Sequence, residues 1–432
     1  MFENILATVS QIGTVDPVSL NGIGKLLLGF FSSIGSVGVA VILFTLIVKV
    51  IPLPLDVFSR FSTKKNEFIM QRMKPQLEKL KKQYANNPQL YQQKLSAVYK
   101  KEGYSMFGAC LPLLVSLVFF WVVFAAFQSY SRYAVVENYN EVVKSYNAVV
   151  QTEHDAEGVN YAEGTENYRV IAADFAENTP AYNEIAARFA PGTDEYKKIE
   201  DAYKEGGEKY DAELSAEENF KNMEAAVEEA KNAALKAAIS AKVEEAIGAK
   251  MNERADEIID KASEAAKVRY NEVNSGFLWV KNIWVADSAL SKAVPNADSF
   301  QKMTGTTVDA TSYDLVTGKL DKDEVNGYFI LPILCMLFSF LSQFIMQKLQ
   351  KNQTDLQATP GQPNTMKMMT YVMPILFGFF ALSYSGSFTV YMIVSSVYST
   401  LTTLLINWIA GKVIAKKMAK KQQEQQPDYM KK

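Results

Sequence analysis

One positive charge lies inside the most continuous apolar run of the chain. Residues 37–55, VGVAVILFTLIVKVIPLPL, suffice to cross a bilayer as a helix, which takes about 20 residues, and Lys49 is their only charged residue. A cation inside a membrane helix costs roughly 2.5–3.5 kcal/mol even on the lenient insertion scale. Either the lysine stem reaches the polar flank that begins at Asp56, or the ammonium group faces a water-filled cavity and meets an anionic group there.

The remaining reactive residue types show no catalytic pattern. The sequence has no Gly-rich phosphate loop with its lysine, no nucleophile triad and no His/Cys cluster with metal-ligand spacing. The two cysteines, Cys110 and Cys335, fall in apolar runs and predict buried thiols rather than a disulfide. The one histidine, His154, lies in a polar region. We therefore expect no enzyme activity and no cofactor, so that any function depends on recognition and solvation.

Apolar runs predict an all-α membrane protein with five transmembrane helices, and the charge between them predicts its orientation. Residues 56–105 carry a net charge of +7, residues 347–368 carry +2 and residues 412–432 carry +5, whereas residues 129–276 carry −14. Because basic short loops stay in the cytoplasm, we expect a bacterial plasma-membrane protein with its N-terminus outside and its C-terminus in the cytoplasm.

The predicted division alternates spans with outer and cytoplasmic segments. Its outer segments are the N-terminal region with an interfacial amphipathic helix (1–34), an acidic helical insert (129–276) and an interfacial segment with a loop (277–327). Its cytoplasmic segments are a helical hairpin (56–105), a loop (348–366) and a basic tail (411–432). The five spans are expected at 35–55, 106–128, 328–347, 367–384 and 387–410.

The cytoplasmic segment 56–105 has the pattern of two helices. Asn87 and Pro88 suit an N-cap and a first helical position, and the second helix, 89–102, is expected to end at Gly103. The hairpin is either a solvated charged connector or a surface for anionic lipid head groups. Its lysines lack an aromatic reading pattern, so DNA is not expected as a partner.

The acidic insert is predicted to be helical. The residues Gly192-Thr193-Asp194 start one helix, and Ser215 with Glu218 forms a capping box that opens a long helix to about Asn274. Its regularly spaced alanines favour a narrow helical bundle or hairpin, which is either an inert elaboration or a docking surface. Beyond it, Trp279 and Trp284 fit an interfacial aromatic belt.

Several co-linear segments resemble the YidC/Oxa/Alb family of membrane protein insertases. TLIVKVIPLPL is similar to the family's in-membrane cation before a Leu-Pro-Leu step, and Pro75 to the proline of its cytoplasmic hairpin. The step GACLP (108–112), the segment GFLWVKNIWVAD (276–287) and the stretch YSGSFTVYMIVSSVYS (384–399) also resemble family segments. The resemblance covers about 21–130 and 276–411, but lysine stands at position 49 where the family has arginine.

The resemblance implies a hydrophilic groove that is open to the cytoplasm and to lipid and closed on the outside. Client helices slide along its rim while their polar tails enter it. We expect the groove to be lined by Lys49, Ser116, Gln343, Ser395 and Ser396. We expect clients to touch the hairpin and rim at Met70, Met73, Pro75, Met369 and Met373.

The implied partners are nascent single-span and small membrane proteins and membrane lipids, with the Sec translocon, the signal-recognition pathway and the ribosome (through the basic tail) as further partners. Two other hypotheses remain. In one, the protein is a transporter or channel for an anionic solute that passes Lys49; inverted repeats and broken helices would favour it. In the other, the outer insert carries the main function and the spans are an anchor.

Overall fold

The computed structural model describes residues 9, 11–104, 107–357 and 365–424, and their side chains except at 107–116, 350–370 and 418–424. Within this part the regular structure is helical, and the β-pairing consists of two isolated bridges, Phe277 with Val280 and Lys292 with Val325. The chain divides into two compact units. One comprises residues 1–14, 141–269 and 315–319, and the other comprises residues 15–140, 270–314 and 320–432.

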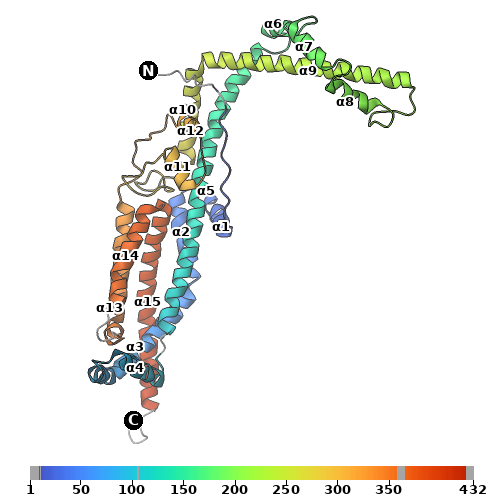
Figure 1. Cartoon of the computed structure of the whole chain (residues 1–432). Helices are drawn as coiled ribbons and strands as arrows, with labels where there is room; N and C mark the ends of the chain where they lie inside the picture. Colours follow the sequence, from blue (N-terminus) through green and yellow to red (C-terminus); the bar gives the residue numbers. More distant parts are fainter. Residues whose placement is uncertain (1–8, 10, 105–106, 358–364, 425–432) are drawn as a thin grey trace. The chain divides into compact units, whose positions relative to one another are not determined.

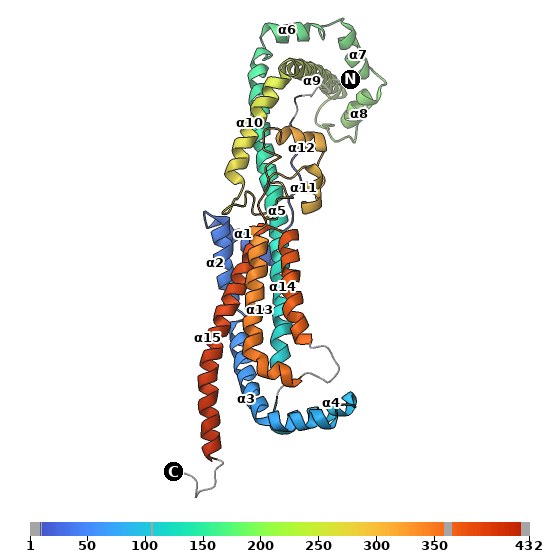
Figure 2. The same ribbon diagram turned by 90° about the vertical axis from the view of Figure 1, so that its left-hand side faces the viewer.

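The second unit contains a helical bundle. Its helices α2 (Val37–Val50), α3 (Leu53–Gln83), α13 (Ile330–Gln357) and α14 (Thr365–Ser383) all contact α15 (Gly386–Glu424). Figures 1 and 2 show α13, α14 and α15 side by side. Helix α15 therefore joins the other four helices.

Helix length and composition identify membrane spans in this bundle. Among the described residues, Ile330–Leu349 and Gly386–Lys417 are long and apolar enough to cross a membrane. The pair Val37–Val50 and Leu53–Gln83 passes the same test together, with a bend of 55° between its helices, and would be a third span. Tyr371–Ser383 is apolar but shorter.

Helix α5 (Phe107–Asn160) runs through the predicted second span and, as expected, continues beyond it. Aromatic side chains join its apolar part to α14 and α15. The ring of Phe124 lies 5.1 Å from that of Phe388 and 4.8 Å from that of Tyr384, and the ring of Phe127 lies 5.3 Å from that of Tyr391. Such edge-to-face and tilted contacts stabilise the packing beyond the area that they bury.

The segment between α10 and α13 closes one end of the bundle. The buried carboxylate of Asp287 accepts the N–H groups of Tyr328 (2.8 Å) and Leu331 (2.6 Å) and the indole N–H of Trp279 (3.1 Å). It therefore caps the first turn of α13, whose N–H groups have no partner within the helix. Two short helices, α11 (Ala297–Thr304) and α12 (Ala310–Val316), follow in the same region.

The prediction of an aromatic belt was wrong for Trp284. Its ring is buried, 6.3 Å from Phe31 of α1 (Gly22–Ser32) and 5.1 Å from Tyr130 of α5. Nearby, the backbone of Gly38 lies directly against the ring of Phe277, with no room for a Cβ atom. Close packing thus holds α1, α2 and α5 to the 276–287 segment.

Two helices that pack against each other lie in the segment predicted as a helical hairpin. Helix α3 ends at Gln83, and α4 (Pro88–Glu102) begins after the N-cap Asn87 and ends at Gly103, which has a positive φ of 70°. A buried cluster joins the two helices: Ile69, Met70, Met73, Leu77, Tyr91, Leu95, Tyr99 and Tyr104. The hydroxyl groups of Tyr91 and Tyr99 are buried in this cluster and have no hydrogen-bond partner within the described part of the chain.

In the first unit, three short helices repeat one 14-residue pattern: α6 (Glu166–Ala173), α7 (Pro180–Arg188) and α8 (Asp194–Tyr203). Each begins after a threonine whose hydroxyl accepts the N–H of a tyrosine three residues on. A residue with positive φ precedes each threonine, and the series continues once more, at Gly164, Asn178, Gly192 and Gly206. All three helices contact α9 (Ala216–Glu253), as Figure 1 shows.

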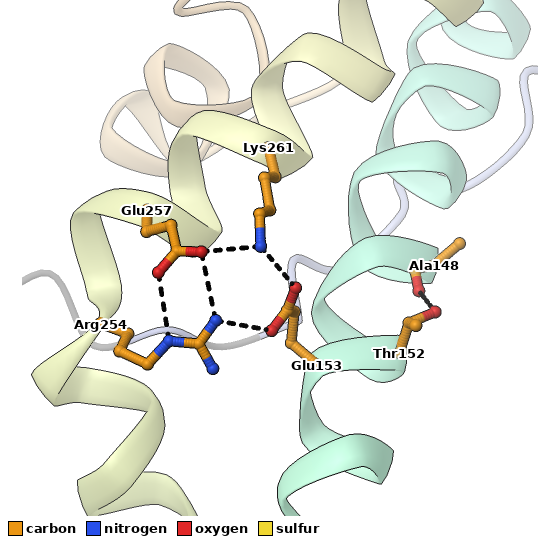
Figure 3. Close-up of polar contacts among 6 residues, drawn as sticks. All are labelled: Ala148, Thr152, Glu153, Arg254, Glu257 and Lys261. Atoms are coloured by element: carbon orange, nitrogen blue, oxygen red, sulfur yellow. Dashed lines mark hydrogen bonds and ion pairs between the residues drawn. The ribbon is translucent and has the colours of Figure 1, made fainter.

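The long helix predicted to reach about Asn274 is interrupted. Helix α9 starts at the predicted capping box of Ser215 and Glu218 but ends at Glu253, and α10 (Ala255–Val273) begins after Arg254. At this break, as Figure 3 shows, the Arg254 guanidinium binds Glu257 (3.1 Å) on α10 and Glu153 (3.2 Å) on α5. The expected narrow bundle is therefore a helix covered by three short ones, followed by a separately anchored helix.

Candidate functional site

Charged side chains form a row along α2 and the start of α3. Lys49 lies in the last turn of α2, and Asp56 and Arg60 lie seven and eleven residues further on. Asp56 interacts electrostatically with both cations, and all three side chains are half-buried. The row therefore alternates positive, negative and positive charge and keeps one net positive charge inside an apolar bundle.

The guanidinium group of Arg60 lies between two other helices of the bundle. Its Nη2 donates to Thr403 Oγ1 on α15 at 2.9 Å, and its Nη1 contacts Met346 Sδ on α13 at 3.0 Å. Both partners are neutral. Arg60 thus joins α3 to α13 and α15 without being neutralised by them.

Polar side chains continue from Arg60 along α13 and α15. The hydroxyls of Ser339 and Ser396 lie 3.4 Å apart, so these two helices also meet there. On α13, Gln343 and Met346 follow Ser339 at four and seven residues, which places all three on one face. On α15, Thr400 and Thr403 follow Ser396 with the same spacing.

We call this set the polar lining. Its rows come from α2 with α3, from α13 and from α15, and they converge on Arg60. Its members are Lys49, Asp56, Arg60, Ser339, Gln343, Ser396, Thr400 and Thr403. An intramembrane row of hydroxyl, amide and charged groups can hold water or a polar segment, and an apolar helix face cannot.

Three of the five predicted groove residues lie in this lining. Lys49, Gln343 and Ser396 belong to it, and Ser395 is half-buried beside the hydroxyl of Tyr391. The side chain of Ser116 lies outside the described residues. Gln343 thus lies one turn beyond Ser339 on α13, and Ser339 contacts Ser396 on α15.

The predicted client contacts occupy different environments. Met70 and Met73 are 0% and 1% exposed, because both pack between α3 and α4. Pro75 is exposed on α3, and Met373 is half-buried on α14. The side chain of Met369 lies outside the described residues. A client can touch the two hairpin methionines only if the hairpin opens.

Sequence reasoning did not select Arg60, Ser339, Thr400 or Thr403 as candidate lining residues. Arg60 was counted as one of many charges of the hairpin, because its sequence neighbours are polar. The signal that could have found it is its helical register on α3: Arg60 follows Asp56 by four residues, so these two side chains share a face.

Comparison with known proteins decides the family. The family model described as "60Kd inner membrane protein" matches residues 29–154 and 267–430. The chain belongs to this family. The match includes the polar lining, the hairpin and the 276–287 segment, and it leaves out residues 155–266, which contain α6, α7, α8 and α9. The resemblance to the YidC/Oxa/Alb insertases is therefore confirmed.

Individual relatives in this family are named membrane protein insertase YidC. The protein from Treponema denticola is 36% identical over 104 residues, which are 24% of this chain and 17% of the relative. The one from Caldanaerobacter subterraneus is 30% identical over 112 residues, 26% of this chain and 52% of the relative. The one from Clostridium tetani is 39% identical over 99 residues, 22% of this chain and 43% of the relative.

These matches span between about a sixth and about half of the length of the relatives. No solved structure matches the chain. Membership of the 60Kd inner membrane protein family, together with the apolar helices of the bundle, makes this chain a bacterial membrane protein.

Proposed function

We propose that the protein is a membrane protein insertase that receives client segments along the polar lining and releases them sideways into the bilayer. The observation that carries the proposal is the lining itself: two cations and a run of hydroxyl and amide groups inside an apolar bundle. Water held there shortens the apolar distance that a client's polar tail must cross, which is the costly step of insertion. The net positive charge attracts acidic residues of that tail.

The packing at the other end of the bundle supports a groove that is closed on one side. The rings of Phe31, Phe44, Phe127, Tyr130 and Trp284 form a contiguous cluster there. The N–H groups of Gly386 and Ser387 at the start of α15 donate to Val285 (2.9 Å) and Ile283 (2.9 Å). A tightly packed end excludes water, so we place the opening of the groove at the end that carries Arg60.

The proposed topology is the five-span arrangement with the N-terminus outside. The net charges of the hairpin and the tail support it, because basic short segments stay in the cytoplasm. The proposed partners are nascent membrane proteins with short polar tails, and membrane lipids. Contacts with a Sec translocon, the signal-recognition pathway or a ribosome belong to the same proposal and rest on the family alone.

Insertion into proteoliposomes tests the function. The client is a single-span protein with a short acidic outer tail, and protease protection of the tail reports insertion. The unmodified protein is compared with Lys49→Ala and Lys49→Glu. We expect the unmodified protein to insert the client and Lys49→Glu to abolish insertion, because it reverses the sign of one end of the charged row.

The other outcomes are equally informative. Equal insertion by all three proteins would mean that Lys49 only extends to the polar flank and that the groove depends on other residues. Failure of all three, together with passage of an anionic solute, would contradict the insertase proposal and favour a transporter.

A further inference from the structure

Arg60 differs from Lys49 in the chemistry it offers. A guanidinium group is planar and carries five N–H donors in a fixed fork, whereas an ammonium group is a compact point charge on a flexible stem. In the structure, Arg60 uses one donor on Thr403 and one contact on Met346. The remaining donors have no partner among the described residues.

The surroundings of Arg60 hold it in place without satisfying its charge. Among the described residues, no carboxylate lies within ion-pair distance of the guanidinium, and Asp56, one helical turn away, acts on Lys49 as well. The contacts with Thr403 on α15 and Met346 on α13 hold the guanidinium against both helices. A half-buried, oriented and incompletely paired guanidinium is suited to bind a carboxylate through two parallel N–H···O bonds.

The position of Arg60 in the row suggests an order of contact. Arg60 lies eleven residues beyond Lys49, on the other side of the bend between α2 and α3. It lies at the end of the lining away from the packed aromatic cluster, so a segment that enters from the open end meets Arg60 before Lys49.

We propose that Arg60 selects clients with acidic tails by binding a tail carboxylate at the entrance of the polar lining, before the tail reaches Lys49. This inference rests on the proposed insertase function and names the residue that gives it charge specificity. Asp56 limits how long the carboxylate stays, because it competes for the same cation. The contact with Thr403 is a positioning contact, since it orients the guanidinium and does not touch the client.

The test compares two clients that differ only in tail charge. One tail carries four Asp residues and the other four Asn residues. Each is inserted into proteoliposomes by the unmodified protein and by Arg60→Gln, Arg60→Lys and Asp56→Asn. Lys65→Gln is the matched control, because Lys65 lies on the same helix with the same charge but is exposed.

We expect Arg60→Gln to lower insertion of the Asp client at least fivefold while the Asn client changes less than twofold. Arg60→Lys should lower insertion of the Asp client by a smaller factor, because lysine keeps the positive charge but lacks the planar fork of the guanidinium. Asp56→Asn should raise the preference for the Asp client, and Lys65→Gln should change neither. An equal loss for both clients in Arg60→Gln, or no loss for either, would overturn the inference.

A binding measurement separates failure of this inference from failure of the proposed function. Fluorescence anisotropy of labelled Asp-tail and Asn-tail client peptides is measured with the detergent-solubilised full chain. If the unmodified protein inserts neither client, the insertase proposal fails. The carboxylate-binding step at Arg60 is then still supported if the Asp-tail peptide binds at least fivefold tighter than the Asn-tail peptide and Arg60→Gln removes this difference. Equal binding of both peptides would refute it.

Discussion

The side chains of Arg60 and Thr403 meet across the bundle, with Nη2 donating to Oγ1 at 2.9 Å, although 343 positions separate them in the chain. This contact joins the helix that follows the first apolar run to the middle of the last helix. It places a cation of the predicted cytoplasmic hairpin at the end of the polar lining. The hairpin and the bundle are thus connected through a group whose remaining donors have no partner among the described residues.

Thr403→Val removes the hydroxyl that accepts from Arg60. Because a hydrogen bond to a charged group contributes about 1.5–3 kcal/mol, we expect the free energy of unfolding to fall by about that amount. Thermal unfolding in detergent measures it. Thr402→Val is the matched control, since the hydroxyl of Thr402 bonds only to carbonyls of its own helix. Equal losses in both variants would argue against the Arg60 contact.

Asp287→Ala removes the acceptor of three N–H groups at the closed end of the bundle. With buried donors left unsatisfied, we expect the free energy of unfolding to fall by about 3 kcal/mol or more. Limited proteolysis between α12 and α13 should accelerate in parallel. Asp298→Ala, at an exposed position on α11, should change stability by less than about 0.5 kcal/mol.

Gly38→Ala introduces a Cβ atom where the Phe277 ring already lies. Such overpacking typically costs about 1–3 kcal/mol. Adding Phe277→Ala should relieve the clash, so a double-mutant cycle should show that the two costs do not add. Gly29→Ala, where a Cβ would meet nothing within 4 Å, is the control. Additive costs at positions 38 and 277 would contradict the contact.

Tyr99→Phe and Tyr91→Phe remove buried hydroxyls for which no described residue is a hydrogen-bond partner. Since an unsatisfied buried polar group costs about 1–3 kcal/mol, each substitution should stabilise the closed hairpin by roughly 1 kcal/mol. Hydrogen exchange of α4 amides should slow several-fold. Tyr84→Phe, at a half-buried position, should have little effect. Faster exchange in Tyr99→Phe would show that its hydroxyl has a stabilising partner.

The corner between α9 and α10 should be sensitive to acid. Hydrogen bonds from Arg254 and then Lys261 lower the pKa of Glu257 from 4.5 to about 2. A carboxylate whose pKa is lowered by folding stabilises the folded state fully when the pH is above its pKa in the unfolded chain. This contribution is lost as the pH falls through its pKa in the folded protein. The difference in melting temperature between the unmodified protein and Glu257→Gln should therefore be largest above about pH 4.5 and shrink steadily as the pH falls toward 2. A difference that does not change between pH 5 and pH 2 would contradict the assignment.

Local signals in the sequence predicted the helix ends well. Asn87, Gly103, Thr193 and the capping box at Ser215 act at the positions expected, because a cap depends on residues three or four apart. Apolar runs and family segments likewise indicated the bundle and the hairpin. Of the groove residues, Lys49 stood out because a single charge in an apolar run is visible without any tertiary structure.

Features that depend on distant contacts could not be predicted. The burial of Met70 and Met73 follows from the packing of α4 on α3, and a methionine in an amphipathic helix looks the same whether it faces a partner helix or a client. The contact of Arg254, at the break between α9 and α10, joins it to Glu153 of α5, about a hundred residues away. Arg60 differs from the other cations of the hairpin through its contact with Thr403 of α15, which only the folded structure shows.

The repeat of α6, α7 and α8 divides part of the first unit into separate pieces. Each short helix contacts α9 directly, and each begins with its own threonine cap. Loss of one cap should therefore loosen one short helix and leave the other two on α9. The segment 155–266, which the family match leaves out, thus contains several small parts that share one supporting helix.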